Sequence, residues 1–282
     1  MVIEESLLLI GLMFYAITIY SVINKKIENY SHWILFAGVF FHFSSAIIRW
    51  IEIGHPPIFG TYEASLQGSW FIALYVLISY KSIYKHFKAM ALTAIPMVIL
   101  LIVYGASFNR KRIPLTISEL SLWVDFHALF SWLAYAPFTL AFCLSGIYLY
   151  NSRKEPTNRI KINHKNNGLW PKPEIIDELC SRYINLGFVN HTIMIILGSY
   201  YSSILHGKWW QWDPVESTAL ITWLSTALYI HMRLFYKWKE KKAAVLYIVI
   251  FITVIFSYWG LIYMPQGSTY HIFDLEYKGG HG

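Results

Sequence analysis

Charged residues and cysteines are both scarce in this sequence. Asp, Glu, Lys and Arg together make up 14% of its 282 residues, and only two cysteines are present. So little charge excludes an ordinary soluble globular domain, in which about a quarter of the residues are charged. Cys143 and Cys180 are too far apart for a CxxC redox pair, so we expect no disulfide framework.

Apolar and aromatic side chains, in contrast, are abundant. Hydrophobic residues make up 56% of the chain, with 12 Trp, 21 Tyr and 18 Phe. A helix crosses a hydrocarbon layer of about 30 Å with roughly 20 apolar residues. Eight such runs occur, near residues 5–23, 33–53, 65–84, 89–107, 128–150, 183–205, 216–236 and 243–263. We therefore predict an all-α fold, a polytopic helical membrane protein with about eight transmembrane helices in a single domain, residues 1–282.

The first apolar run follows Glu4 and Glu5 and has neither a basic flank nor a small-residue cleavage site. We therefore expect a retained helix here and not a removable signal peptide.

The distribution of basic residues predicts the orientation of these helices. If successive runs alternate in direction, 17 of the 23 Lys and Arg fall on one side of the membrane. Basic residues mark the cytoplasmic side, so both termini and the connection near 206–217 are predicted to lie outside. The longest inner connection, about 151–178, is predicted to be a basic loop without a fold of its own. Because topology accounts for the net charge of +7, we expect no nucleic-acid partner.

The stretch "ILHGKWWQWDPVESTALITW" at 204–223 is the most unusual on the outer side. Asp213 and Pro214 stand directly before a predicted helix, and Glu216 falls in its first turn, a pattern typical of a capped helix start. An interfacial aromatic belt would explain scattered tryptophans, but it would not explain their attachment to a fixed turn. We interpret the stretch as a ligand platform.

The 11 histidines fall into groups by predicted depth. An ionisable side chain inside a membrane is costly and is a functional candidate by default. The histidines within predicted spans are His42, His191 and His231. For His42 and His191 a packing or hydrogen-bonding role is an equal alternative, and His231 could also bond a neighbouring helix. The predicted outer histidines are His55, His127, His206, His271 and His281.

The kind of ligand follows from what accompanies the outer histidines. The sequence has no HxxxH, HExxH or CxxC motif, which disfavours a small metal ion. Broad aromatic surface from Trp209, Trp210 and Trp212 is present instead. Flat aromatic rings with a few axial imidazoles suit a large planar macrocycle.

Four segments resemble a known family. "GKWWQWDPVES" resembles the WWD signature, roughly WGxxWxWDPxE, of haem-handling proteins of cytochrome c assembly. "RWIEIGHPPIFGTYEAS", "WVDFHALFSWLAYAPF" and "LYIHMR" resemble segments of the CcsA (ResC) family, the membrane component of the System II cytochrome c synthase. The resemblance covers most of the chain from about residue 49 onward.

The resemblance implies a ligand, haem b, and roles for named residues. His127 and His271 would be the external axial ligands of haem iron, and His231 would be one member of an inner pair. Trp209, Trp210 and Trp212 would form the haem surface. His206 replaces the first tryptophan of the signature, and the sequence around His271 departs from the family pattern, so His206 or His281 remain alternatives to His271. Asp213, Pro214 and Glu216 would belong to the same haem-binding motif, in which Asp213 and Glu216 hold the loop and the helix start.

The same resemblance implies an activity: haem delivery across the membrane and its presentation for thioether attachment to the CxxCH motif of apocytochrome c. The chain would be a holocytochrome c synthase (haem lyase) subunit, active with a CcsB/ResB-like partner that supplies the second inner histidine. A thioredoxin-like protein would keep the substrate thiols reduced. The expected location is the bacterial cytoplasmic (inner) membrane, with the plastid thylakoid membrane as the alternative.

Two other functions remain open at this stage. One is a haem exporter or chaperone of the CcmC/CcmF type without its own ligation activity, and the other is a b-type electron-transfer subunit.

The residues that could hold the haem propionates are Arg49, Arg110, Lys111, Arg112 and Lys208.

Overall fold

The computed structural model describes residues 2–82, 87–108, 110, 115, 119–153 and 171–258. Within these residues all regular structure is helical, with eight α-helices and one short 3-10 helix, η1 (Glu28–Tyr30). The predicted all-α class is confirmed. The helices are α1 (Val2–Ile23), α2 (Ser31–Ile53), α3 (Gly60–Ser82), α4 (Phe87–Ala106), α5 (Leu122–Arg153), α6 (Pro173–His206), α7 (Pro214–Leu234) and α8 (Glu240–Tyr258).

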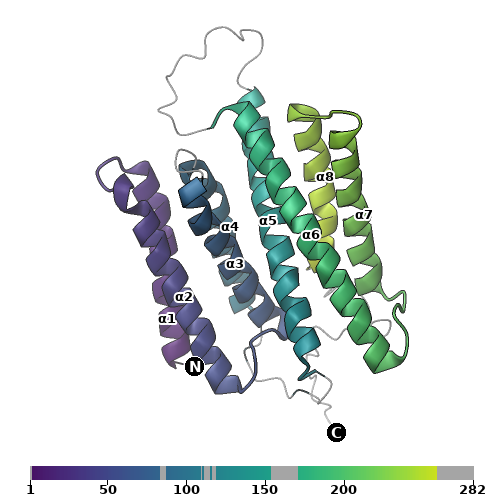
Figure 1. Ribbon diagram of the computed structural model, residues 1–282. Helices are drawn as coiled ribbons and strands as arrows, with labels where there is room; N and C mark the ends of the chain where they lie inside the picture. The colour runs from purple at the N-terminus through teal and green to yellow at the C-terminus, as the bar shows by residue number, and fades with distance from the viewer. Residues whose placement is uncertain are drawn as a thin grey trace.

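The eight described helices run side by side in one bundle, and helices that follow each other along the chain are antiparallel neighbours (Figure 1). The central helix, α5, packs against α6, α8 and α3. We call the end of the bundle where α6 ends and α7 begins the tryptophan end. The opposite end, where α5 ends and α7 turns into α8, is called the basic end.

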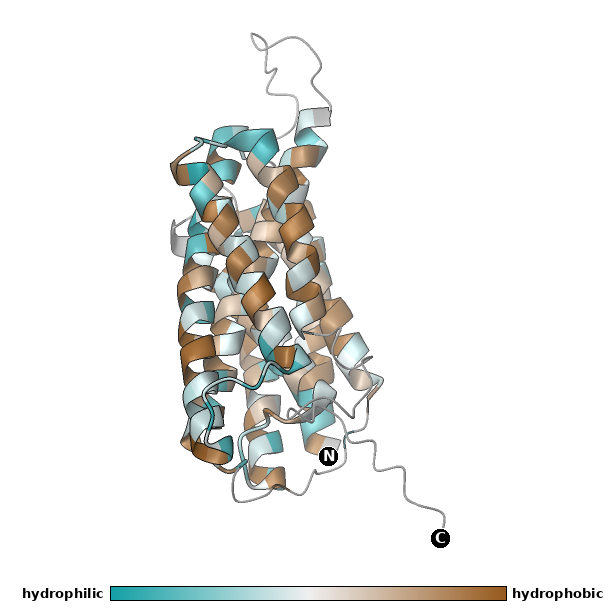
Figure 2. Cartoon of the chain, turned by 90° about the vertical axis from the view of Figure 1, so that its right-hand side faces the viewer, coloured by the Kyte–Doolittle hydropathy of each residue, from teal (hydrophilic) through white to brown (hydrophobic). Residues whose placement is uncertain are grey.

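Six of these helices are long and apolar enough to cross a membrane: α1, α2, α4, α5, α6 and α8. The other two, α3 and α7, have 23 and 21 residues, which is long enough, but their composition is more polar. Hydrophobic residues fill the middle of the bundle and polar ones gather toward its ends (Figure 2). The chain is therefore a multi-pass membrane protein, while the spanning of α3 and α7 and the outer position of both termini remain predictions.

The predicted loop at 151–178 is wrong at both ends, because α5 continues to Arg153 and α6 already begins at Pro173. Lys172 precedes it in an extended conformation, proline occupies the first helical turn, and Ile176 and Asp177 are buried. The 34 residues of α6 extend about 50 Å at 1.5 Å per residue. This helix is therefore longer than a hydrocarbon layer, and it carries side chains beyond the layer.

A proline inside α5 links that helix to α3. Pro137 has no N–H, so the carbonyl of Leu133, four residues earlier, loses its usual helical donor. The hydroxyl of Tyr75 on α3 donates to this carbonyl at 3.4 Å. The Leu133 carbonyl thus receives a weak hydrogen bond from a neighbouring helix in place of the one that Pro137 removes.

Buried charges fasten the first three helices together at the tryptophan end. The guanidinium of Arg49, at the end of α2, donates to the carboxylate of Glu63 in the first turn of α3, with N–O distances of 2.5 and 3.1 Å. The hydroxyl of Tyr62 donates to the Glu4 carboxylate of α1 at 2.7 Å. All four side chains are almost fully buried, so these charges hold the scaffold together.

Candidate functional site

The Trp-Asp-Pro turn of the sequence motif forms a doubly capped helix start. Asp213 is the N-cap of α7, and its carboxylate accepts the backbone N–H of Glu216 at 2.7 Å. The Glu216 carboxylate reaches back and accepts the N–H groups of Gln211 and Trp212 at 2.6 and 2.8 Å. The first bond satisfies a backbone donor that a helix start leaves unpaired. The other two hold the backbone just before the helix, so the turn has a defined conformation. The predicted cap is present.

This fixed turn displays indole rings on the protein surface. Trp209 and Trp212 are 61% and 71% exposed, and Trp210 is half-buried. Trp212 has a φ of 59°, a left-handed conformation that a bulky side chain rarely adopts. The bond from its N–H to Glu216 helps to hold that backbone. Glu216 thus helps to keep an exposed indole in a strained backbone conformation.

The exposed indoles continue an aromatic row that starts on α5. The ring centroids of Trp123 and Tyr200 are 4.6 Å apart, and those of Tyr200 and Trp209 are 5.9 Å apart. Trp210 and Trp212 meet edge to face at 6.0 Å. We call these five residues, Trp123, Tyr200, Trp209, Trp210 and Trp212, the aromatic cluster. It brings together the start of α5, the end of α6 and the turn before α7.

His127 lies on α5 one turn after Trp123, and so on the same helical face. Its Nδ1 is 2.9 Å from the backbone carbonyl oxygen of Met194 on α6. A carbonyl oxygen can only accept, so Nδ1 carries the proton, and in a neutral imidazole the lone pair is then on Nε2. A hydrogen bond from the ring nitrogen that does not bind the metal sets the tautomer of metal-binding histidines in this way.

The other predicted outer histidines are placed only in part. His206 is the last residue of α6 and is exposed, and Gly207 closes the helix in a left-handed conformation with φ 69°. His271 and His281 lie outside the described residues, so their positions relative to His127 stay a prediction. His55 is buried in the connection after α2, where its Nδ1 is 2.9 Å from the carbonyl oxygen of Pro56.

His231 lies far from the aromatic cluster, in the last turn of α7 at the basic end (Figure 1). Since α7 has 21 residues, its two ends are about 30 Å apart. The His231 ring is exposed on the bundle surface and packs on Phe235, with ring centroids 4.5 Å apart. The helix that begins at the tryptophan turn thus carries His231 at its other end, as the sequence predicts, while which end is outside stays a prediction.

The two other histidines inside predicted spans are fully enclosed. The Nδ1 of His42 lies 3.2 Å from the hydroxyl of Tyr15, a bond between α2 and α1 that agrees with the packing alternative. His191 on α6 is 0% exposed and lies between the rings of Tyr135 and Phe138. Among the described residues neither of its ring nitrogens has a hydrogen-bond partner.

An ion pair in the last turn of α7, the turn that also holds His231, was not predicted from the sequence. Asp177 of α6 accepts both terminal nitrogens of Arg233 at 2.7 and 2.9 Å, and its Oδ1 also accepts the Glu240 N–H at the start of α8. The sequence shows only an acidic residue near the start of α6 and a basic residue in the last turn of α7, without linking the two. Through Asp177 this pair joins α6, α7 and α8 at the basic end.

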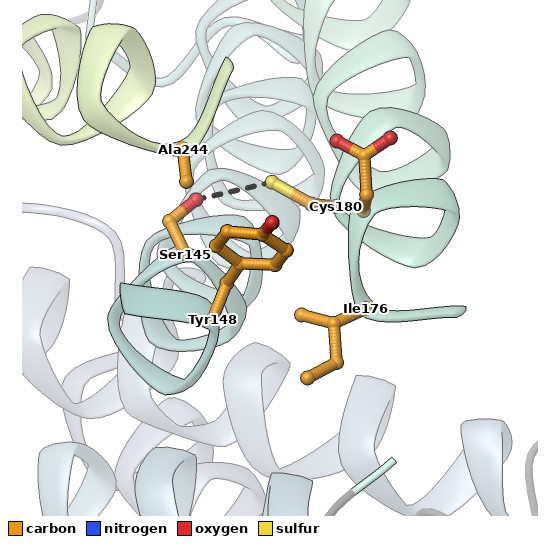
Figure 3. A pocket seen from close by; sticks show the side chains of 6 residues that line it. Ser145, Tyr148, Ile176, Cys180 and Ala244 are labelled. Atoms are coloured by element: carbon orange, nitrogen blue, oxygen red, sulfur yellow. Dashed lines mark hydrogen bonds between the residues drawn. The ribbon is translucent and has the colours of Figure 1, made fainter. Parts of the chain in front are cut away.

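A small gap beside this ion pair shows how tightly the basic end is packed (Figure 3). Residues of α5, α6 and α8 line it, and Cys180 turns its sulfur toward the hydroxyl of Ser145 at 3.1 Å. The gap leaves no room for a water molecule. It is therefore a packing feature and no ligand cavity.

The described part of the chain contains no group of three or more His, Cys, Asp or Glu side chains that could hold a metal ion. The cationic candidates also differ in their surroundings. Arg49 is buried against Glu63, and Arg110 is paired with Glu5 at 2.8 Å. Lys208 is exposed in the loop next to Trp209. Lys111 and Arg112 lie outside the described residues.

Comparison with known proteins identifies the family. The family described as "Cytochrome C assembly protein" matches residues 58–268, a range that holds the aromatic cluster, His127 and His231. "Cytochrome c biogenesis protein CcsA" of Prochlorococcus marinus subsp. pastoris is 30% identical over 273 residues, which cover 89% of this chain and 86% of the relative. Proteins with the same name from Chlamydomonas reinhardtii and Mesostigma viride are 30% and 28% identical, over 81% and 78% of this chain and 64% and 78% of their own lengths. The chain therefore belongs to the cytochrome c assembly protein family, and within it to the CcsA proteins.

Proposed function

We propose that this protein delivers haem across the membrane and presents it to apocytochrome c for covalent attachment, as a subunit of a System II cytochrome c synthase. The observation that supports this most directly is the exposure of Trp209 and Trp212 on a doubly capped turn. Large apolar rings on a rigid surface suit a flat apolar ligand, because covering them removes apolar area from water without a cost in ordering the site. In this account haem is the substrate and no permanent cofactor.

The residues beside the aromatic cluster fit the chemistry of haem b. His127 has its Nδ1 proton bound by the Met194 carbonyl, which presents Nε2 as an iron ligand. We propose His271 as the ligand on the opposite side of the iron, with His206 or His281 as the alternative. Two strong imidazole ligands would restrain side reactions at the iron.

The haem propionates require a cation or hydrogen-bond donors, and Lys208 is the best described candidate. Lys208 is exposed and stands between Gly207 and Trp209 in the chain. Arg49 is engaged with Glu63 inside the scaffold, so its guanidinium is already neutralised. We therefore assign one propionate to Lys208, at the edge of the aromatic cluster.

Attachment is an addition of a thiol to a vinyl group. The sulfur of each CxxCH cysteine bonds to the inner vinyl carbon, and a proton ends on the outer carbon, so no oxidant is consumed. The contribution of this protein is to hold the haem with its vinyl edge accessible and to exclude competing reactions. Asp213 and Glu216 are occupied in capping the helix, so they act as structural residues of the motif.

The inner position favours a second protein. His231 is exposed at the basic end of α7 and has large apolar neighbours, Phe235 and Tyr236, which are 71% and 64% exposed. A CcsB/ResB-like partner would cover this surface and supply the second imidazole. We place the assembly in the bacterial cytoplasmic membrane, with the aromatic cluster outside. A thioredoxin-like protein would keep the CxxCH thiols reduced.

Co-expression with an apocytochrome c tests this function. The chain, with and without a CcsB/ResB-like partner, is produced together with an apocytochrome that contains one CxxCH motif, and covalent haem is stained after denaturing electrophoresis. We expect a stained cytochrome only with the partner, and its loss when His127 is replaced by alanine. Haem retained by the chain but never attached would favour the chaperone alternative. Haem that cycles between redox states without transfer would favour the electron-transfer alternative.

A further inference from the structure

His127 is seated against a glycine of the neighbouring helix. A Cβ atom built on Gly198 of α6 would be 2.9 Å from Cε1 and 2.9 Å from Nδ1 of the His127 ring. Contacts below 3.0 Å do not occur for real Cβ atoms, so a side chain at position 198 would displace the ring. The backbone of Gly198 has no need of a left-handed conformation, because it lies within a regular helix. Glycine is therefore needed at position 198 because it has no side chain, and not because of its backbone freedom.

The close approach allows the hydrogen bond that sets the state of His127. Its Nδ1 reaches the Met194 carbonyl, which is one turn before Gly198 on α6, at 2.9 Å. That carbonyl has two lone pairs and can accept from the imidazole in addition to its helical donor. A methyl group at position 198 would occupy the space through which the ring passes to reach this oxygen. The position of the His127 ring and its tautomer thus both depend on the absence of a Cβ atom at Gly198.

We propose that Gly198 is a positioning residue for haem ligation: its lack of a side chain seats His127 so that Nδ1 binds Met194 and Nε2 faces the substrate iron. The inference rests on the proposed function, in which His127 is an axial ligand. It adds a residue of α6 that never touches haem yet determines the orientation of a residue on α5.

A double-mutant cycle without haem tests the contact. Gly198→Ala, His127→Ala and the double variant are compared by melting temperature in detergent. Alanine favours a helix over glycine, so without a clash Gly198→Ala would keep or raise the melting temperature. We expect it to fall by a few degrees when His127 is present and to stay unchanged in the His127→Ala background. If Gly198→Ala alone yields no folded protein, recovery in the double variant is the supporting result.

Spectra of the haem-loaded proteins test the positioning role, with two matched glycine controls. A Cβ on Gly146 of α5 meets nothing within 4 Å, whereas a Cβ on Gly187 of α6 lies 2.5 Å from the Phe138 ring, away from His127. Gly187→Ala therefore also disturbs the α5–α6 contact, but at a different place. We expect Gly198→Ala to shift haem from low spin toward high spin, as loss of an imidazole ligand does. Gly146→Ala and Gly187→Ala should keep the low-spin spectrum.

The outcomes separate this inference from the proposed function. If Gly198→Ala keeps the parent spectrum while His127→Ala loses it, the inference is wrong and the ligand assignment stands. A fall in melting temperature that persists in the His127→Ala background also overturns the inference, because the methyl group would then strike something other than the ring. If His127→Ala itself leaves the spectrum unchanged, the ligand assignment fails and the inference fails with it.

Discussion

The carboxylate of Glu216 accepts the backbone N–H of Trp212 at 2.8 Å, a bond from α7 to the turn that precedes it. Glu216 lies in the first turn of α7, and Trp212 lies outside the helix in a left-handed conformation. The bond therefore transmits the rigidity of a buried helix to an exposed indole. The helix start and the tryptophan turn before it therefore form one rigid unit.

Replacement of Glu216 by alanine tests this unit. The change removes the acceptor of the Gln211 and Trp212 N–H groups, and hydrogen bonds to charged groups contribute about 1.5–3 kcal/mol. We expect haem affinity to fall about tenfold, which corresponds to ~1.4 kcal/mol, because the indoles lose their fixed position. Glu216→Gln retains an oxygen acceptor and should lose much less. Equal losses for both variants, in a haem titration, would show that the acceptor is not what matters.

Removal of the exposed indoles should weaken haem binding without destabilising the fold. Trp209 and Trp212 are 61% and 71% exposed, so Trp209→Ala and Trp212→Ala remove few internal contacts. An aromatic contact with a flat ligand contributes about 0.5–1.5 kcal/mol beyond its area, and we expect a loss of about tenfold for each variant. Trp33 on α2 is 62% exposed but lies at the basic end, so Trp33→Ala is the matched control. A control that loses as much haem as the two variants would refute a specific site.

The charge of Lys208 should contribute to haem binding through a propionate. We expect Lys208→Ala to weaken haem affinity roughly tenfold, since a charge-assisted bond contributes about 1.5–3 kcal/mol when well placed. Lys208→Arg should retain most of the affinity, and Lys241→Ala at the start of α8 should have no effect. The direct check uses a haem analogue whose propionates are esterified. If Lys208→Ala weakens the ester as strongly as it weakens haem, the propionate assignment is incorrect.

The ion pair between Asp177 and Arg233 should stabilise the basic end. Its side chains are only 10% and 16% exposed, and removing one partner of such a pair leaves the other charge uncompensated. We expect Asp177→Ala to lower the free energy of unfolding by about 3 kcal/mol, the low end for a buried pair, measured by denaturant titration. The neighbouring pair of Glu178 and Arg182 has a similar N–O distance, 2.6 Å against 2.7 Å, but its side chains are 62% and 71% exposed. Glu178→Ala should therefore cost under about 1 kcal/mol, and a cost as large as that of Asp177→Ala would contradict the role of burial.

Much of the helical framework could be predicted because apolar run length reports directly on helices in a membrane. The start of α7 was equally readable, since the signals at Asp213, Pro214 and Glu216 are local. The early start of α6 was missed because burial of Asp177 depends on Arg233, which is 56 residues away. The contact between His127 and Gly198 could not be predicted either, because the register between α5 and α6 decides which glycine faces which ring. Arg49 looked like a surface cation for the same reason, as its partner Glu63 is on another helix.

The central claim is that the aromatic cluster holds haem iron between imidazoles from distant parts of the chain. The most direct test is the absorption and electron paramagnetic resonance spectrum of the purified protein, compared with His127→Ala and His271→Ala. We predict a red protein with a low-spin bis-imidazole spectrum, and in each variant a loss of haem or a shift to high spin. Haem content and an axial signature that stay unchanged in both variants would contradict the account.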